Sequence, residues 1–335
     1  MKELAKLNEN YAKDRYNIYY ASDKLENGDT ETAELFVFDG INKKYFKNYN
    51  DEQEEGLLEQ WTKGNIDRFL KDKNAIYYMG RIISKKINSS TAELITFLHG
   101  DSFFLIRDGK NVYLYDEVSE TTTKISDDPD HFELLSAEYF KDSKTVISLS
   151  LFTNHIKPKR AIEGAHAASF QSLGGLWGKD INTVYAMGWK ISESDPLSFK
   201  VLNYMYAKDK THVYDSYGTV ISEADSKSFV VCFGDAAKDK NHVYKQSVIL
   251  KEADPETYVE LIHNYGKDKK HVYFGLNIVK GADIETFITI KSGAGIDKDN
   301  VFVEGKIDNQ LKSDPNFLNN SLHDYLHLKG YWFSK

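Results

Sequence analysis

The sequence predicts an all-β fold, an array of short antiparallel β-meander repeats of about 29 residues each. Three columns of residues keep this period. The aromatic residue that ends each charged turn recurs at steps of 29, 30, 29 and 29 residues, at Tyr185, Tyr214, Tyr244, Tyr273 and Phe302. A second column precedes it by 15 residues, at Phe170, Phe199, Phe229, Tyr258 and Phe287. A third lies four residues earlier still, at His166, Asp195, Asp225, Asp254 and Asp283. Repeats of this length indicate stacked units that cannot close a core alone.

The spacing continues upstream in a less regular form. Asp128, Phe132 and Ile147 keep the offsets of 4 and 15 residues. Related stretches are KDRYNIYY (13–20), KDKNAIYY (71–78) and RDGKNVYLY (107–115). We therefore expect roughly nine or ten units in three parts. These parts are divergent repeats with a helical insertion over 1–160, regular repeats over 161–317 and a C-terminal cap over 318–335.

Each unit is predicted to hold three short strands. Runs such as SFVVCFG, HVY and SVIL are short, β-branched or aromatic, and bounded by turn residues. The KDKN-type segment forms a hairpin turn, since Asp and Asn bond their own backbone. A second turn carries glycine in several copies, at Gly188, Gly218, Gly275 and Gly305.

The Val-Tyr pair of each unit has two alternative arrangements. Adjacent strand residues point to opposite faces of a sheet. One of the two columns is therefore core. Stacking is expected to bury the valine column, at positions 184, 213, 243, 272 and 301. The tyrosine column either packs in a second layer or lines an exposed face.

The connection between units is predicted to be a single helical turn. In EADPETY (252–258), Asp254 is a good N-cap and Pro255 suits the first helical position. The segments ESDPLSF and EADSKSF repeat the device. Because strand-like residues resume at once, a full helix is not expected.

One segment departs from the repeat. Residues 51–72 carry Leu57, Leu58 and Trp61 at roughly helical spacing among charged residues, which predicts an inserted amphipathic helix interrupted near Gly64. The helix either caps the array or binds a partner. The array itself could instead close into a propeller-like ring, although 29 residues are few for a four-stranded blade.

The bulk composition excludes some partners. A net charge of -8 argues against nucleic acid, which needs a basic surface, and would suit a basic partner. No stretch approaches the about 20 apolar residues of a membrane span. The first residues also lack the apolar core of a signal peptide. Cys232 is the single cysteine, so no internal disulfide can form. These features predict a cytoplasmic protein.

No motif in the sequence predicts catalysis, a metal or a cofactor. Each charged turn offers one carboxylate beside lysines, whereas calcium needs six to eight oxygens. The recurring histidines are interrupted by Thr183 and Asn300 at the same place, and they stand at His212, His242 and His271. The stretch SLGGLWGKD (172–180) lacks the spacing of a phosphate-binding loop. We therefore expect no enzyme activity.

The stretches KDKNAIYY, KDKNHVY and ADPETY…YGKDKKHVY resemble the bacterial DKNYY family, named for its repeated motif. The resemblance covers most of residues 70 to 317. It implies a bacterial repeat protein and no reaction. Such families often accompany polymorphic toxins as immunity proteins, and that role is an expectation from context.

By elimination, the expected function is a protein-binding scaffold, such as an immunity protein that blocks a basic bacterial toxin. Repeat arrays offer long surfaces, and Tyr and Trp are frequent interface anchors. The less regular aromatics are the predicted contact residues, namely Trp61, Trp177, Trp189 and Tyr217. The alternative is a carbohydrate-binding or glycan-acting β-repeat protein whose aromatics stack on sugars.

Overall fold

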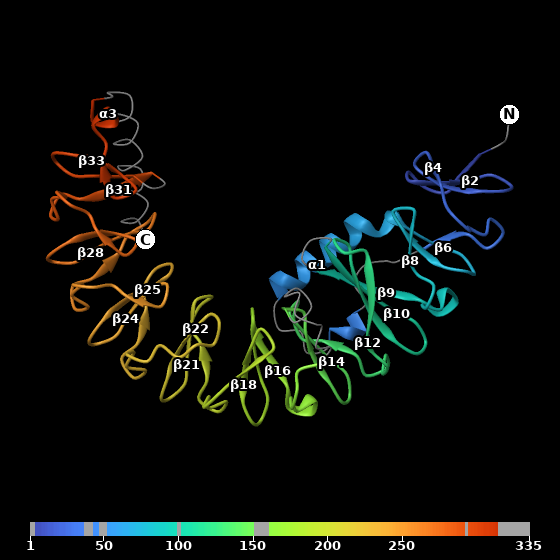
Figure 1. Cartoon of the computed structure of the whole chain (residues 1–335), viewed down its shortest axis with the longest axis horizontal. Helices are drawn as coiled ribbons and strands as arrows, with labels where there is room; N and C mark the ends of the chain where they lie inside the picture. The colour runs from blue at the N-terminus through green and yellow to red at the C-terminus, as the bar shows by residue number, and fades with distance from the viewer. Residues whose placement is uncertain are drawn as a thin grey trace. The chain divides into compact units, whose positions relative to one another are not determined.

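The computed structural model describes residues 4–36, 43–46, 52–98, 102–150, 161–291 and 294–313. These ranges form nine short antiparallel sheets, none of which closes into a barrel, so the predicted all-β class is confirmed (Figure 1). The chain divides into two compact units, residues 1–192 and 193–335. The predicted cap over 318–335 lies outside the described residues. No helix among those described is long and apolar enough to span a membrane.

The first unit holds five sheets, numbered 1 to 5 here in chain order. In each sheet, strands that follow one another in the sequence pair antiparallel. Sheet 1 contains β1 (Ala5–Lys6), β2 (Tyr11–Lys13), β3 (Ile18–Tyr20) and β4 (Asp23–Lys24). Sheet 2 contains β5 (Glu34–Leu35), β6 (Phe69–Lys71), β7 (Ile76–Tyr78) and β8 (Arg81–Ser84). Sheet 3 contains β9 (Glu93–Leu98), β10 (Phe103–Arg107), β11 (Val112–Asp116) and β12 (Thr121–Ser126). Sheets 4 and 5 contain β13 (Glu133–Leu134), β14 (Tyr139–Lys141), β15 (Val146–Ser148), β16 (Gln171–Gly174), β17 (Trp177–Lys179), β18 (Val184–Ala186) and β19 (Trp189–Ile191).

The second unit holds sheets 6 to 9. Sheet 6 contains β20 (Lys200–Val201), β21 (Tyr206–Lys208) and β22 (Val213–Asp215). Sheet 7 contains β23 (Val230–Val231), β24 (Ala236–Lys238), β25 (Val243–Lys245) and β26 (Val248–Ile249). Sheet 8 contains β27 (Val259–Glu260), β28 (Tyr265–Lys267), β29 (Val272–Phe274) and β30 (Asn277–Ile278). Sheet 9 contains β31 (Ile288–Lys291), β32 (Ala294–Ile296), β33 (Val301–Val303) and β34 (Lys306–Ile307), and the short helix α3 (Asn309–Lys312) follows.

Most sheets have four strands where the sequence predicted three. The extra strand arises because the first apolar run of each unit is divided by a tight turn. The same division occurs in sheet 6, which has three strands in all, where Asn203 Oδ1 accepts hydrogen bonds from the backbone N–H groups of Met205 and Tyr206. This side-chain turn reverses the chain before the KDK segment. The sequence analysis did not recognise it.

Each sheet in the middle of a unit is buried on both faces. On sheet 7, Tyr244 packs toward Tyr206 of sheet 6, whereas Val243 packs toward Tyr258 and Tyr273 of sheet 8. All members of both the valine and the tyrosine columns are buried. Of the two alternatives for the tyrosine column, the structure therefore has the second buried layer. The stack has two cores per sheet because neighbours lie on both sides.

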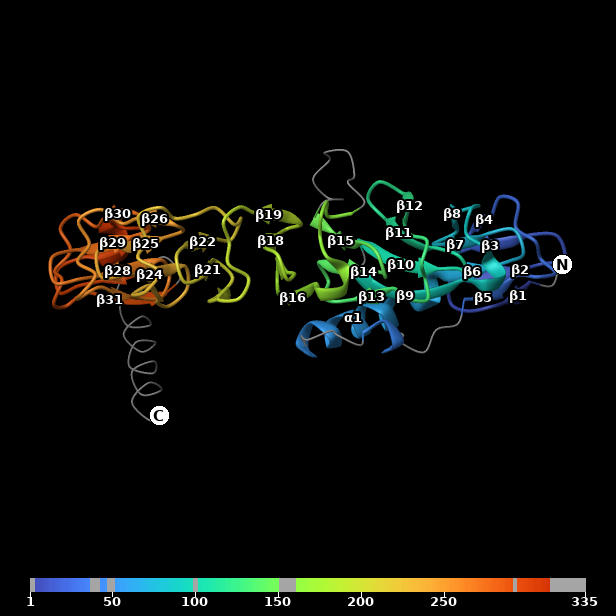
Figure 2. The ribbon, with the colours of Figure 1, turned by 90° about the horizontal axis from the view of Figure 1, so that it is seen from below.

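The predicted helical insertion is present but shorter than the predicted residues 51–72, because Phe69–Lys71 form strand β6. Helix α1 (Glu52–Asn65) is followed by a 3-10 turn, η2 (Ile66–Arg68), so its end lies within a residue of the predicted interruption. Figures 1 and 2 show α1 alongside β9. The buried Thr62 hydroxyl lies 3.2 Å from that of Thr96 on β9 and accepts the N–H of Phe97. The helix thus covers part of sheet 3.

The remaining short helical turns lie at connections. The 3-10 turns are η1 (Lys43–Tyr45), η3 (Ser89–Thr91) and η4 (Ala167–Ser169). At the equivalent place after Asp254, the N–H of Tyr258 bonds the Asp254 carbonyl at 2.9 Å, which is one turn and no more. The predicted one-turn crossover is therefore confirmed.

Candidate functional site

The aspartate of each KDK-type turn joins three parts of its own repeat. Asp268 Oδ1 accepts the N–H groups of Lys270 and His271, both at 2.7 Å. Its Oδ2 accepts the Tyr273 hydroxyl at 3.0 Å and the N–H of Asp254, at the start of the helical turn, at 2.8 Å. The same set of bonds recurs at Asp180, Asp209 and Asp239.

These bonds shift the pKa values of both partners. Burial opposes ionisation of the Asp209 carboxyl, but the donated bonds from Asp195 and His212 outweigh it, and the pKa of Asp209 lies well below its usual range. Burial and the adjacent Asp209 carboxylate raise the pKa of the Tyr214 hydroxyl. The pair is therefore locked as carboxylate and phenol, which suits a structural bond and offers no general acid or base near neutral pH.

The first lysine of the motif ties one repeat to the next. Lys267 Nζ donates to the carbonyl oxygens of Ile284 and Phe287 at 3.1 and 3.2 Å, where the following helical turn ends. Lys208 makes the same pair of bonds to Ser226 and Phe229. Ammonium groups are favourable at such carbonyl-rich ends.

The second lysine pairs with the aspartate that begins the helical turn of its own repeat. These pairs are Lys210–Asp195, Lys240–Asp225, Lys269–Asp254 and Lys298–Asp283. All three charged positions of KDK are thus occupied by contacts within the stack. The histidines that follow lie 3.3 to 3.5 Å from the tyrosine hydroxyls, at His212, His242 and His271. Among the described residues no group of three His, Cys, Asp or Glu side chains could hold a metal ion.

The opposite ends of the strands carry the variable positions of the repeat. We call this the Gly-turn edge, and it includes Met79–Gly80, Ser216–Gly218, Gln246–Ser247 and Glu304–Gly305. Met79 and Gly80 have φ values of 50° and 78°, and Glu304 and Gly305 have 48° and 75°. Two consecutive left-handed residues give a tight hairpin that matches the twist of the strands. Consecutive hairpins then leave a hollow between them.

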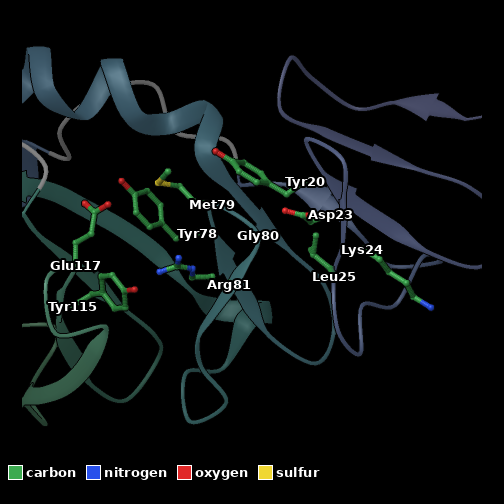
Figure 3. Close-up of a pocket in the computed structure, with 10 residues that line it drawn as sticks. All are labelled: Tyr20, Asp23, Lys24, Leu25, Tyr78, Met79, Gly80, Arg81, Tyr115 and Glu117. Carbon is green, nitrogen blue, oxygen red and sulfur yellow. The ribbon is translucent and has the colours of Figure 1, made fainter.

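One such hollow lies in the first unit and has a volume of about 420 Å³. Figure 3 shows Tyr20 on one side, and Tyr78 and Tyr115 with Arg81 on the other. Its lining carries charges of both signs, Lys24 and Arg81 against Asp23 and Glu117. Arg81 also pairs with Glu120. The mixture favours no single class of ligand.

A second hollow, of about 390 Å³, lies between the hairpins of sheets 6 and 7. We call it the Tyr217 hollow, and its lining consists of Tyr204, Met205, Asp215, Ser216, Tyr217, Asp235, Gln246 and Ser247. Among these lining residues the only charged side chains are two carboxylates. An equivalent hollow between sheets 8 and 9 is lined instead by Lys280, Lys306 and Glu304. The same backbone arrangement therefore carries different side chains at these two interfaces.

A buried ion pair lies beside the Tyr217 hollow. Lys245 Nζ is 2.5 Å from Glu260 Oε1 and 3.6 Å from Asp235 Oδ1. The side chains of Lys245 and Glu260 are 2% and 3% exposed. Burial, partly offset by the bond from Lys245, raises the pKa of Glu260. In neighbouring repeats, the position of Lys245 holds Asp215 or Phe274, and the position of Glu260 holds Val231 or Thr289.

The four predicted contact residues fall in different environments. Trp177 is 3% exposed and lies in the core, so it is not available to a partner. Trp61 is partly buried and packs against two core clusters. Trp189 is 48% exposed in the first unit, and Tyr217 is 72% exposed in the second. Only Tyr217 lies at a hollow described above.

Sequence reasoning missed two further exposed aromatics of the second unit. Tyr204 is 69% exposed and Phe233 is 63% exposed, and both lie in turns between the first two strands of their sheets. Both stand outside the repeating columns, as Tyr217 does. The criterion that selected irregular aromatics would therefore have found them if it had been applied to every turn.

Comparison with known proteins gives one positive result. The model of the DKNYY family matches residues 1–176 and again residues 177–306. No curated protein and no solved structure matches the chain.

Proposed function

We propose, on the premise that the chain belongs to the DKNYY family, that it is a non-catalytic, protein-binding repeat scaffold. One observation carries the proposal. The repeating aromatics are buried in the stack, whereas Tyr204, Tyr217 and Phe233 are exposed in turns of sheets 6 and 7. Tyr204 and Tyr217 also line the hollow between these sheets. Exposed aromatics beside a hollow are typical anchors for a protein partner.

The charge of the chain supports a basic partner. The net charge is -8, and the Tyr217 hollow adds two carboxylates to the aromatic surface. Opposite charges steer a partner toward such a surface. The more specific form of the proposal is an immunity protein of the bacterial cytoplasm that neutralises a basic domain of a polymorphic toxin.

Capture from a bacterial lysate tests the general proposal. The full chain is compared with a variant carrying Tyr204→Ser, Tyr217→Ser and Phe233→Ser. The control variant replaces exposed apolar residues elsewhere in the same unit, Leu197→Ser, Val230→Ser and Val259→Ser. We expect a captured protein that the first variant loses and the control retains, with weaker capture at higher salt.

The toxin form needs a further step. Expression of the captured protein alone should arrest bacterial growth, and co-expression of this chain should restore it. A partner retained by the aromatic variant would contradict the proposed surface. Specific binding to a glycan array, lost in the same variant, would favour the carbohydrate-binding alternative instead.

A further inference from the structure

We infer that the Tyr217 hollow receives an arginine side chain of the partner protein. The inference deepens the proposed function and rests on it, because it names the chemical group recognised at the same surface.

The lining of the hollow selects a cation. Asp215 and Asp235 both line it, and no lysine or arginine is among the described lining residues. Beside the hollow, Lys245 is engaged by Glu260 at 2.5 Å and lies 3.6 Å from Asp235, so Asp215 is the lining carboxylate without a described cation partner. The three carboxylates thus outnumber the single ammonium group. A neutral or anionic guest would leave this excess negative charge uncompensated.

The free hydrogen-bonding capacity also fits a donor. Asp215 Oδ1 accepts the N–H groups of Tyr217 and Thr219, both at 2.9 Å. Within the described part of the chain its Oδ2 has no partner. Ser247 also lines the hollow, but its side chain and its backbone N–H are both hydrogen-bonded to the Tyr206 hydroxyl. Asp215 Oδ2 is therefore the acceptor available to a donor from a guest.

The aromatic rings favour arginine over lysine. A guanidinium group is planar, stacks on aromatic faces and donates through several N–H groups at once. Tyr204 and Tyr217 line the hollow and are both more than two-thirds exposed, so their rings are accessible to a stacked guest. The volume of about 390 Å³ lies within the usual range for a ligand pocket.

A peptide titration tests the inference with defined probes. The full chain, labelled at tyrosine, is titrated with acetyl-Gly-Arg-Gly-amide, followed by NMR. Citrulline and lysine peptides of the same length are the comparisons, since citrulline keeps the shape of arginine and lacks its charge. We expect saturable shifts at Tyr204 and Tyr217 with a Kd of about 1 mM, and at least about tenfold weaker binding of citrulline.

Variants localise the effect. Asp215→Asn keeps Oδ1 and therefore the turn, but removes the charge, so it should weaken arginine binding about tenfold. Glu304→Gln is the matched control, because it removes a carboxylate from the equivalent hollow between sheets 8 and 9 and should change nothing. Thermal unfolding of both variants confirms that they are folded.

The outcomes separate this inference from the proposed function. Equal binding of arginine and citrulline, or no saturable shift at either tyrosine, would overturn the hollow as an arginine site. Equal binding of lysine would overturn the choice of arginine. If Asp215→Asn captured a protein as well as the natural chain does, the proposed protein-binding function would hold and the arginine site would be overturned. If the chain bound arginine peptides but captured no protein, the arginine site would hold and the proposed function would be overturned.

Discussion

The Tyr273 hydroxyl donates a hydrogen bond to Asp268 Oδ2, five residues earlier, over 3.0 Å. The bond joins strand β29 to the turn that precedes it, and both groups are buried. Equivalent pairs recur along the chain, which explains why Asp and Tyr return with a fixed offset inside each repeat.

The two members of this pair should differ in importance. Tyr273→Phe should lower the free energy of unfolding by about 1 kcal/mol, because it removes one hydrogen bond and keeps the ring. The chain itself carries Phe302 at the equivalent position. Asp268→Ala should cost about 3 kcal/mol, since it orphans backbone donors as well. Urea denaturation measures the free energy of unfolding of both variants. The control is Asp299→Ala, which changes an exposed aspartate in an equivalent turn and should lie within about 0.5 kcal/mol of the natural chain. An equal loss of unfolding free energy in Asp268→Ala and Tyr273→Phe would contradict the larger role given to the aspartate.

Two glycines should respond in opposite ways to alanine. A Cβ at position 266 would lie 2.2 Å from the Tyr258 hydroxyl oxygen, so Gly266→Ala should destabilise the chain by about 2 kcal/mol through overpacking. A Cβ at position 56, in helix α1, would meet nothing within 4 Å. Gly56→Ala should therefore stabilise by about 0.5 to 1 kcal/mol. Thermal unfolding of both variants measures these effects, and a neutral Gly266→Ala would show that the core between sheets 7 and 8 is packed less closely than described.

The buried Lys245–Glu260 pair should be replaceable as a pair but not singly. Lys245→Met leaves a buried carboxyl without its cation and should cost about 3 kcal/mol. Lys245→Met combined with Glu260→Val should come within about 1 kcal/mol of the natural chain, since Phe274 and Val231 show that each position accepts an apolar residue in one neighbouring repeat. A double-mutant cycle in urea measures the coupling. Additive effects of the two single changes would show that the charges do not interact.

The turn aspartates should make stability sensitive to acid. Their folded pKa values lie below the unfolded value of about 3.9, so their contribution is complete above that pH and is lost as the pH falls toward the folded values. Glu260 acts in the opposite direction, because burial raises its pKa. With several aspartates against one glutamate, the melting temperature should fall steadily between about pH 5 and pH 2. A melting temperature that holds to pH 3 would contradict the prediction, and Asp268→Asn should give a shallower decline.

The period of the sequence was enough to predict the stacked units, whereas the helical insertion was predicted from the helical spacing of Leu57, Leu58 and Trp61. The period could not predict that both faces of each sheet are buried, because Val243 and Tyr244 point to different neighbours and a single repeat shows only one of them. The additional strand was missed because the turn at Asn203 depends on a local side-chain bond. The Tyr217 hollow depends on residues of two repeats, Asp215 and Asp235, whose proximity no local pattern reveals.

The most direct test of the stacked architecture is the removal of one whole repeat. Deletion of residues 215–244 joins Tyr214 to Lys245 and keeps every column in register, because Tyr214 and Tyr244 are equivalent. We expect this chain to keep its β-sheet circular dichroism and a cooperative, somewhat lower unfolding transition. Deletion of residues 215–229, half a repeat, should unfold the second unit because it removes Phe229 and breaks the register. If the two deletions behaved alike, the chain would not be a stack of interchangeable repeats.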